Sequence, residues 1–112
     1  MIGKGDKEMG KATGIIEVFG LTAAFVAVDA GCKAANVTVE TLDKNKPANA
    51  DALPVPLIMA VKFRGSVADV TAAVDAAAEA VQGVTGVITK HIIANTEDST
   101  DKMLKINAFD KN

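Results

Sequence analysis

The most regular feature of this sequence is a pair of long segments whose pattern of apolar residues predicts helices. Residues 21–35 are apolar on most faces, rich in alanine and free of proline, which predicts a helix buried on more than one side. From Val67 to Val81, apolar residues recur at helical spacing and acidic residues fall between them. This second pattern predicts an amphipathic helix with one face toward solvent.

The residues that flank the second helix predict its ends. Ser66 is followed three positions later by Asp69, which is the spacing of a capping box at a helix N-terminus. Gly83 follows the last apolar position, where a helix C-terminus favours a residue in the left-handed conformation. We therefore expect the helix to lie between Ser66 and Gly83, with Gly83 left-handed.

Four short runs rich in β-branched and other apolar residues predict strands. These runs are residues 14–19, 37–42, 57–63 and 87–93. The segment 43–56, between the second and third runs, holds all three prolines of the chain. Because proline lacks a ladder donor and fixes φ, this segment is expected to be a stiffened loop.

The order of these elements is β-α-β, a loop, and a second β-α-β. It predicts one α/β domain of the ferredoxin-like (α+β) kind, in which four antiparallel strands form one sheet and both helices pack on one of its faces. Residues 13–95 would form this domain. We expect residues 1–12 to be a flexible arm, and residues 96–112 to be a polar tail with a short helix around 101–106.

Composition narrows the classes of function. Apolar residues make up 49 % of the chain but aromatic residues only 4 %, so the core is built mainly from small side chains and subunit contacts are expected to support it. The net charge of −2, without a basic cluster, argues against a nucleic-acid partner. No apolar run approaches the roughly 18 residues that span a membrane, and no signal peptide is apparent, so we expect a cytoplasmic protein without a membrane partner. The single cysteine fits a reducing compartment.

Candidate chemistry is sparse. Residues 5–12 approach a phosphate-binding loop, but Ala12 stands where Ser or Thr must hold Mg²⁺, and no strand precedes the loop. His91 has no second ligand or nucleophile at a useful spacing, so a structural role is favoured. Cys32 is interpreted as a small packing residue, and Asp75 and Glu79 as solvated charges. We therefore predict no catalytic residue, metal or cofactor, and favour a building role over an enzymatic one.

Several phrases of the sequence resemble the shell domain of bacterial microcompartments. The phrases are Thr13–Leu21 (TGIIEVFGL), Val28–Val37 (VDAGCKAANV) and Phe63–Val70 (FRGSVADV), with weaker matches at Val74–Ala77 and Lys90–Ile93. The resemblance runs in order over residues 13–95. It implies a non-enzymatic protein that forms flat homohexamers, which tile with other shell proteins around encapsulated enzymes.

In the resembling family, the loop between the second and third strands lines a pore on the sixfold axis that admits small metabolites. This resemblance assigns the pore loop to Lys44, Asn45, Lys46, Pro47, Ala48, Asn49, Ala50, Asp51, Ala52, Leu53 and Pro54. The loop is longer than the short Gly-Ser turn of typical members. Some relatives bind an iron–sulfur cluster through a cysteine of this loop, and this chain has none there, so no cluster is expected.

The resemblance also suggests which residues lie at the edge between hexamers. The family's edge lysine maps onto Lys33, and Asn36 follows it closely. The family's partner arginine maps onto Asn95, with Ala94 in place of a proline, so the chain departs from the family pattern at this contact.

One alternative shares the predicted order of elements. A trimeric nucleotide-sensing regulator of the nitrogen-signalling type also has a long loop between its second and third strands. Such a regulator needs a phosphate site rich in Gly and Lys between its subunits, and residues 94–96 offer no such group.

Overall fold

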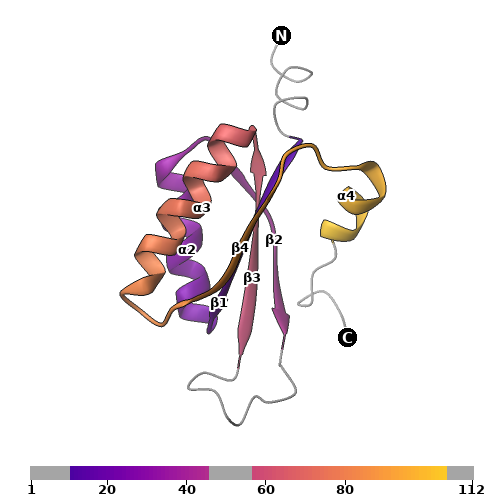
Figure 1. The fold of residues 1–112 in the computed structure, drawn as a ribbon. Coiled ribbons are helices and arrows are strands. Elements are labelled where there is room, and N and C mark those ends of the chain that lie inside the picture. Colours follow the sequence, from indigo (N-terminus) through magenta and orange to yellow (C-terminus); the bar gives the residue numbers. More distant parts are fainter. Residues whose placement is uncertain (1–10, 46–56, 106–112) are drawn as a thin grey trace.

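Four antiparallel strands form one sheet in the computed structural model, which describes residues 11–45 and 57–105 (Figure 1). The strands lie in the order β2-β3-β1-β4. Their bounds are Ala12–Phe19 for β1, Thr38–Asn45 for β2, Ile58–Gly65 for β3 and Val87–Ile93 for β4. β1 is central and pairs with β3 on one side and β4 on the other, which leaves β2 and β4 as the edge strands.

Two helices, α2 (Leu21–Ala34) and α3 (Val67–Gln82), cover one face of the sheet (Figure 1). A third and shorter helix, α4 (Asp98–Leu104), lies on the opposite face. The predicted α/β class is thereby confirmed, with its four-stranded antiparallel sheet and its two long helices on one face. α2 packs over β1, β2 and β3, whereas α3 packs over β1, β3 and β4.

The core lies between the sheet and the two long helices. Met59, Val61 and Phe63 alternate along β3 and are fully buried on the helix side, as expected for a strand with one face toward a core. The buried residues of α2 are all small, namely Ala23, Ala24, Ala27 and Gly31. A Cβ atom at Gly31 would lie 2.4 Å from Cζ of Phe63, so glycine at this position lets the helix and the aromatic ring approach closely.

The two ends of α3 differ in how well the sequence predicts them. Ser66 is confirmed as the N-cap, because the backbone N–H of Asp69 donates to Ser66 Oγ at 3.1 Å. The Asp69 side chain bonds back to the hydroxyl of Ser66, which donates to Asp69 Oδ2 at 3.0 Å. Gly83 was expected to be left-handed and is not, since its φ is −80°. The chain instead continues in a turn in which Val84 N and Thr85 N both donate to the carbonyl of Val81, and the positive φ of 140° occurs at Gly86.

The segment predicted as a loop begins later than the sequence suggests. β2 continues through Asp43, Lys44 and Asn45, which pair with Ala60, Met59 and Ile58 of β3. Lys44 and Asn45 are therefore strand residues, because backbone pairing continues along an edge strand even where the side chains are polar. The rest of the predicted loop, residues 46–56, lies outside the described residues.

The structure also differs from the sequence-based expectation near both termini. β1 begins at Ala12, a residue assigned above to the flexible arm, and Ala12 is buried. α4 spans Asp98–Leu104 rather than 101–106, because Glu97 caps it by accepting hydrogen bonds from Ser99 N and Thr100 N. Residues 1–10 and 106–112 lie outside the described part of the chain.

Candidate functional site

The residues singled out from the sequence gather at two opposite ends of the sheet (Figure 1). The connection between β2 and β3 leaves the sheet at one end, after Asn45. α2 ends, β2 begins and β4 ends at the other end. Lys33, Asn36 and Asn95 therefore share the end of the molecule that is farthest from the β2–β3 connection.

Lys33 lies in the last turn of α2 and is strongly exposed, with 75 % of its side chain accessible. Its Nζ lies 2.8 Å from Oδ2 of Asp29, one helical turn earlier. The hydrogen bond to Asp29, and then the charge of that carboxylate, raise the pKa of Lys33 above its usual value. The ammonium group is therefore charged at neutral pH, and it stands at a helix C-terminus, where the dipole favours a cation.

Asn36 and Asn95 are both exposed, but their backbones are fixed by neighbouring elements. The backbone N–H of Asn36 donates to Asp69 Oδ1 at 3.4 Å, which connects the exit of α2 to the first turn of α3. Asn95 is followed by Thr96, whose backbone N–H donates to the carbonyl of Lys11 at 2.9 Å. The hydroxyl of Thr96 also shares a buried 2.7 Å hydrogen bond with that of Thr13.

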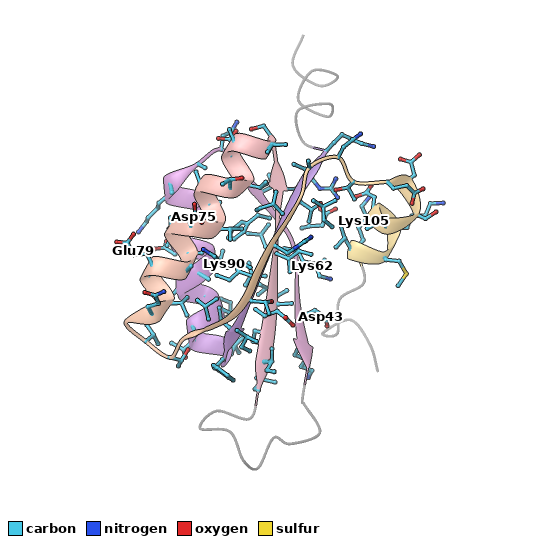
Figure 2. All side chains as sticks on the ribbon, in the orientation of Figure 1. Asp43, Lys62, Asp75, Glu79, Lys90 and Lys105 are labelled. Carbon is cyan, nitrogen blue, oxygen red and sulfur yellow. The ribbon has the colours of Figure 1, made fainter. Side chains whose placement is uncertain are left out.

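A polar cluster on the sheet face that α2 and α3 do not cover holds α4 in place. Arg64 on β3 contacts the carboxylate of Asp101 on α4 and lies 3.8 Å from Glu40 on β2. Lys62 Nζ and Thr41 Oγ1 both donate to the carbonyl of Leu104, at 3.2 and 3.0 Å. Figure 2 shows Lys62 on the α4 side of the sheet.

These contacts between the sheet and α4 were not predicted from the sequence. The available signal was the alternation along β3, which places Lys62 and Arg64 on the face away from the core. A lysine that is only 8 % exposed needs a polar partner, and α4 supplies one through its last carbonyl group.

A shallow hollow lies on the same sheet face, toward the β2–β3 end. Asp43, Ala60 and Glu17 face one another across β2, β3 and β1, and the small side chain of Ala60 leaves a space of about 300 Å³ that Lys44 also lines. Thr89 on β4 completes the row and donates to Glu17 Oε1 at 2.8 Å. The hollow is polar and open, and it contains carboxylates and one ammonium group.

Neither His91 nor Cys32 lines this hollow. His91 pairs with Ile15 across the strands and is exposed. Cys32 was interpreted as a packing residue, but it is exposed on α2, on the side away from the core. Within residues 11–45 and 57–105, no three His, Cys, Asp or Glu side chains gather closely enough to hold a metal ion. Over the same part of the chain, no helix is long and apolar enough to cross a membrane.

Comparisons with known proteins agree on one kind of relative. The family model described as the BMC domain matches residues 12–96. Two curated relatives, each named bacterial microcompartment shell protein PduA, come from Citrobacter freundii and Salmonella typhimurium (strain LT2). Each is 35 % identical over 94 residues, which cover 84 % of this chain and 91 % or 90 % of the relative.

A solved structure adds evidence for the fold alone. The crystal structure of a microcompartment protein from Desulfitobacterium hafniense DCB superposes with a TM-score of 0.65 at 22 % identity. The match covers 84 % of this chain and 46 % of that chain, so the present chain spans about half the length of the solved one.

Proposed function

This chain belongs to the BMC-domain family and is a structural protein of bacterial microcompartment shells, and from that premise we propose that it acts as a cyclic homohexamer with a central pore. Copies of the hexamer would tile edge to edge, together with other shell proteins, into a sheet that encloses enzymes within the cytoplasm. The pore would admit small metabolites. In this role the protein itself is not a catalyst.

The observation that carries the proposal is the separation of the two sets of residues along the sheet. A flat ring needs an inner end, where six copies converge, and an outer end, where neighbouring rings meet. The β2–β3 connection leaves one end of the sheet, while Lys33, Asn36 and Asn95 stand at the other. This arrangement supports an inner assignment for the connection and an outer assignment for Lys33.

The proposed pore lining follows from the same arrangement. Lys44 and Asn45 end β2, and residues 46–54 follow them, so we assign this stretch to the rim and wall of the pore. A charged residue such as Lys46 or Asp51, repeated six times around an axis, would form a ring that selects permeants by charge.

The experiment that tests the proposal is native mass spectrometry of the full chain. We expect a mass of six copies. A trimer would contradict the shell assignment in favour of the nucleotide-sensing regulator, and a nucleotide titration would then show binding. A chain that stays monomeric at high concentration would contradict any ring.

A further inference from the structure

The last two turns of α2 carry two opposite charges side by side. Asp29 and Lys33 are one helical turn apart, and Lys33 Nζ lies 2.8 Å from Oδ2 of Asp29. Both side chains are strongly exposed, at 64 % for Asp29 and 75 % for Lys33. The proposed outer edge of the tile therefore presents a carboxylate and an ammonium group together, and not a lysine alone.

The symmetry of a tiled sheet decides what such an edge must contact. When identical hexamers share an edge and present the same face, a twofold axis perpendicular to the sheet passes through the middle of that edge. A contact across a twofold axis is isologous, so each edge meets the same set of groups on its neighbour. An edge that presented only Lys33 would bring two cations together, and like charges repel each other. A stable contact between hexamers therefore needs a carboxylate near Lys33.

Asp29 is the carboxylate best placed for this contact. Both side-chain oxygens of Asp69, in the first turn of α3, accept hydrogen bonds within the fold. Asp98 belongs to α4, on the opposite face of the sheet, and lies 3.4 Å from Lys11 (Figure 1). Asp29 instead contacts Lys33, another exposed side chain, so its carboxylate can turn toward a neighbouring molecule without disturbing the core.

We propose that Asp29 and Lys33 form a reciprocal ion pair between hexamers, in which Asp29 of each hexamer contacts Lys33 of the next. This inference rests on the proposed hexamer and its tiling, and it adds to them a second residue and the group that Lys33 meets. The twofold axis makes the contact occur twice at every shared edge, so four charges alternate in sign along it. The pair within one chain is then the arrangement of an edge that has no neighbour.

The exposure of the two side chains determines how strong the contact is. An exposed ion pair contributes little by itself and is weakened by salt. A hexamer has several neighbours, however, so many weak contacts hold it in the sheet at once. We therefore expect a sheet that forms reversibly and that dissolves as the salt concentration rises.

The first test reverses each charge separately in the full chain. Asp29→Lys makes this part of the edge wholly cationic, and Lys33→Glu makes it wholly anionic. Native mass spectrometry should still show hexamers of each variant, because both positions are exposed. The critical concentration for sheets seen by electron microscopy should rise by about tenfold or more, since attractive contacts become repulsive ones.

Mixing the two variants separates a contact between hexamers from a contact within one chain. An edge of Asp29→Lys complements an edge of Lys33→Glu, so the mixture should sediment as assemblies that contain both variants, although neither sediments alone. Lys102→Glu is the matched control, because it makes the same charge change on α4, on the opposite face of the sheet, and should form sheets as the wild type does. A mixture that stays dispersed would overturn the reciprocal pair.

The second test needs no substitution. A carbodiimide joins a carboxylate to an amine that it touches, without a spacer, so it records which Asp29 lies against which Lys33. Isotopically heavy and light wild-type hexamers are prepared separately, mixed into sheets and treated with the reagent. Mass spectrometry should find peptides that join heavy Asp29 to light Lys33 in the sheets, and none in mixed hexamers that high salt keeps apart.

The outcomes separate this contact from the proposed function. Wild-type sheets whose cross-links join only chains of the same isotope overturn the reciprocal pair and leave the tile standing, even if a charge-reversed variant fails to fold. A wild-type chain that forms no hexamer, or hexamers that form no sheet at any concentration, overturn the tile and the pair together.

Discussion

Gly31 shows how a single missing side chain sets the distance between two layers. The buried residues of α2 are all small, and the ring of Phe63 lies against Gly31 in the space that they leave. The alanine-rich composition predicted a core of small side chains. It could not predict that Phe63 lies against Gly31, because the two residues are far apart along the chain and meet only when α2 folds onto β3.

Replacing Gly31 with alanine should therefore destabilise the fold. The new Cβ would lie 2.4 Å from Cζ of Phe63 and 3.2 Å from the carbonyl oxygen of Ala73, so the helix must move outward. We expect the free energy of unfolding to fall by about 1–3 kcal/mol, measured by urea denaturation at fixed protein concentration.

The control for this substitution is Gly83→Ala. Gly83 has a right-handed backbone, and a Cβ there would lie 3.8 Å from the carbonyl oxygen of Ala80, an ordinary van der Waals contact. Alanine there should leave stability unchanged or raise it by about 0.4–1 kcal/mol. Equal losses in the two variants would show that the contact with Phe63 is not the cause.

At the scale of elements, α4 needs its contacts with the sheet in order to stay helical. A helix of seven residues is too short to be stable alone in water. Among its residues only Leu104 is buried, so the polar contacts of Arg64, Lys62 and Thr41 with α4 hold it on the sheet.

Arg64→Met should loosen α4 while the sheet and the two long helices remain. The substitution removes the charged partner of Asp101, and a hydrogen bond to a charged group contributes about 1.5–3 kcal/mol. We expect amide hydrogen exchange in residues 99–104 to accelerate by about tenfold or more.

Lys11→Met is the matched control, because it removes the 3.4 Å ion pair between Lys11 and Asp98 at the other end of α4. Both of those side chains are well exposed, and such pairs contribute about 0–1 kcal/mol. Unchanged exchange in Arg64→Met would assign the anchoring of α4 to the burial of Leu104 and to the bonds that Lys62 and Thr41 donate to its carbonyl.

The bounds of β4, β2 and α4 show which features of an element the sequence pattern predicts and which it does not. β4 was predicted with its observed bounds, because apolar and polar residues mark both of its ends. The last residues of β2 are polar and were assigned to a loop, since side-chain composition does not reveal that pairing with β3 continues. α4 was placed too late, because its position depends on the cap at Glu97 and on the distant Arg64.

At the scale of the whole molecule, the strand order brings the candidate edge residues to one end. The predicted fold is sufficient to place Lys33, Asn36 and Asn95 at the same end of the sheet. The i, i+4 pair of Lys33 and Asp29 could also be predicted from the sequence of a helix. The packing of α4 on the sheet face opposite α2 and α3 could not be predicted, because it depends on side-chain contacts between segments that are distant in the sequence.

Lys33→Ala should keep the hexamer and reduce the sheets or tubes seen by electron microscopy. Lys33 is exposed, so its loss leaves the core intact, but the outer end of the tile loses a cation. Because its pKa is raised by Asp29, the wild-type charge is complete below the usual lysine pKa, and sheet formation should weaken only at strongly alkaline pH.

Lys102→Ala serves as the control, because Lys102 is an exposed lysine on α4, on the opposite face of the sheet from α2. Its loss should leave the sheets unchanged. If Lys33→Ala formed sheets as well as the wild type, or if its hexamers dissociated, the edge assignment would be wrong.

The central position of β1 has a consequence for how the protein is made. β1 is synthesised before β2, β3 and β4, yet Gly14 pairs with Phe63 on one side and with Ile92 on the other. β1 has no partner strand on either side until β3 and β4 have emerged from the ribosome. Its backbone therefore stays unpaired in the nascent chain until then. Such distant pairing slows folding relative to a helical bundle. A ribosome that stalls before β4 should therefore release a fragment in which one side of β1 has no partner strand.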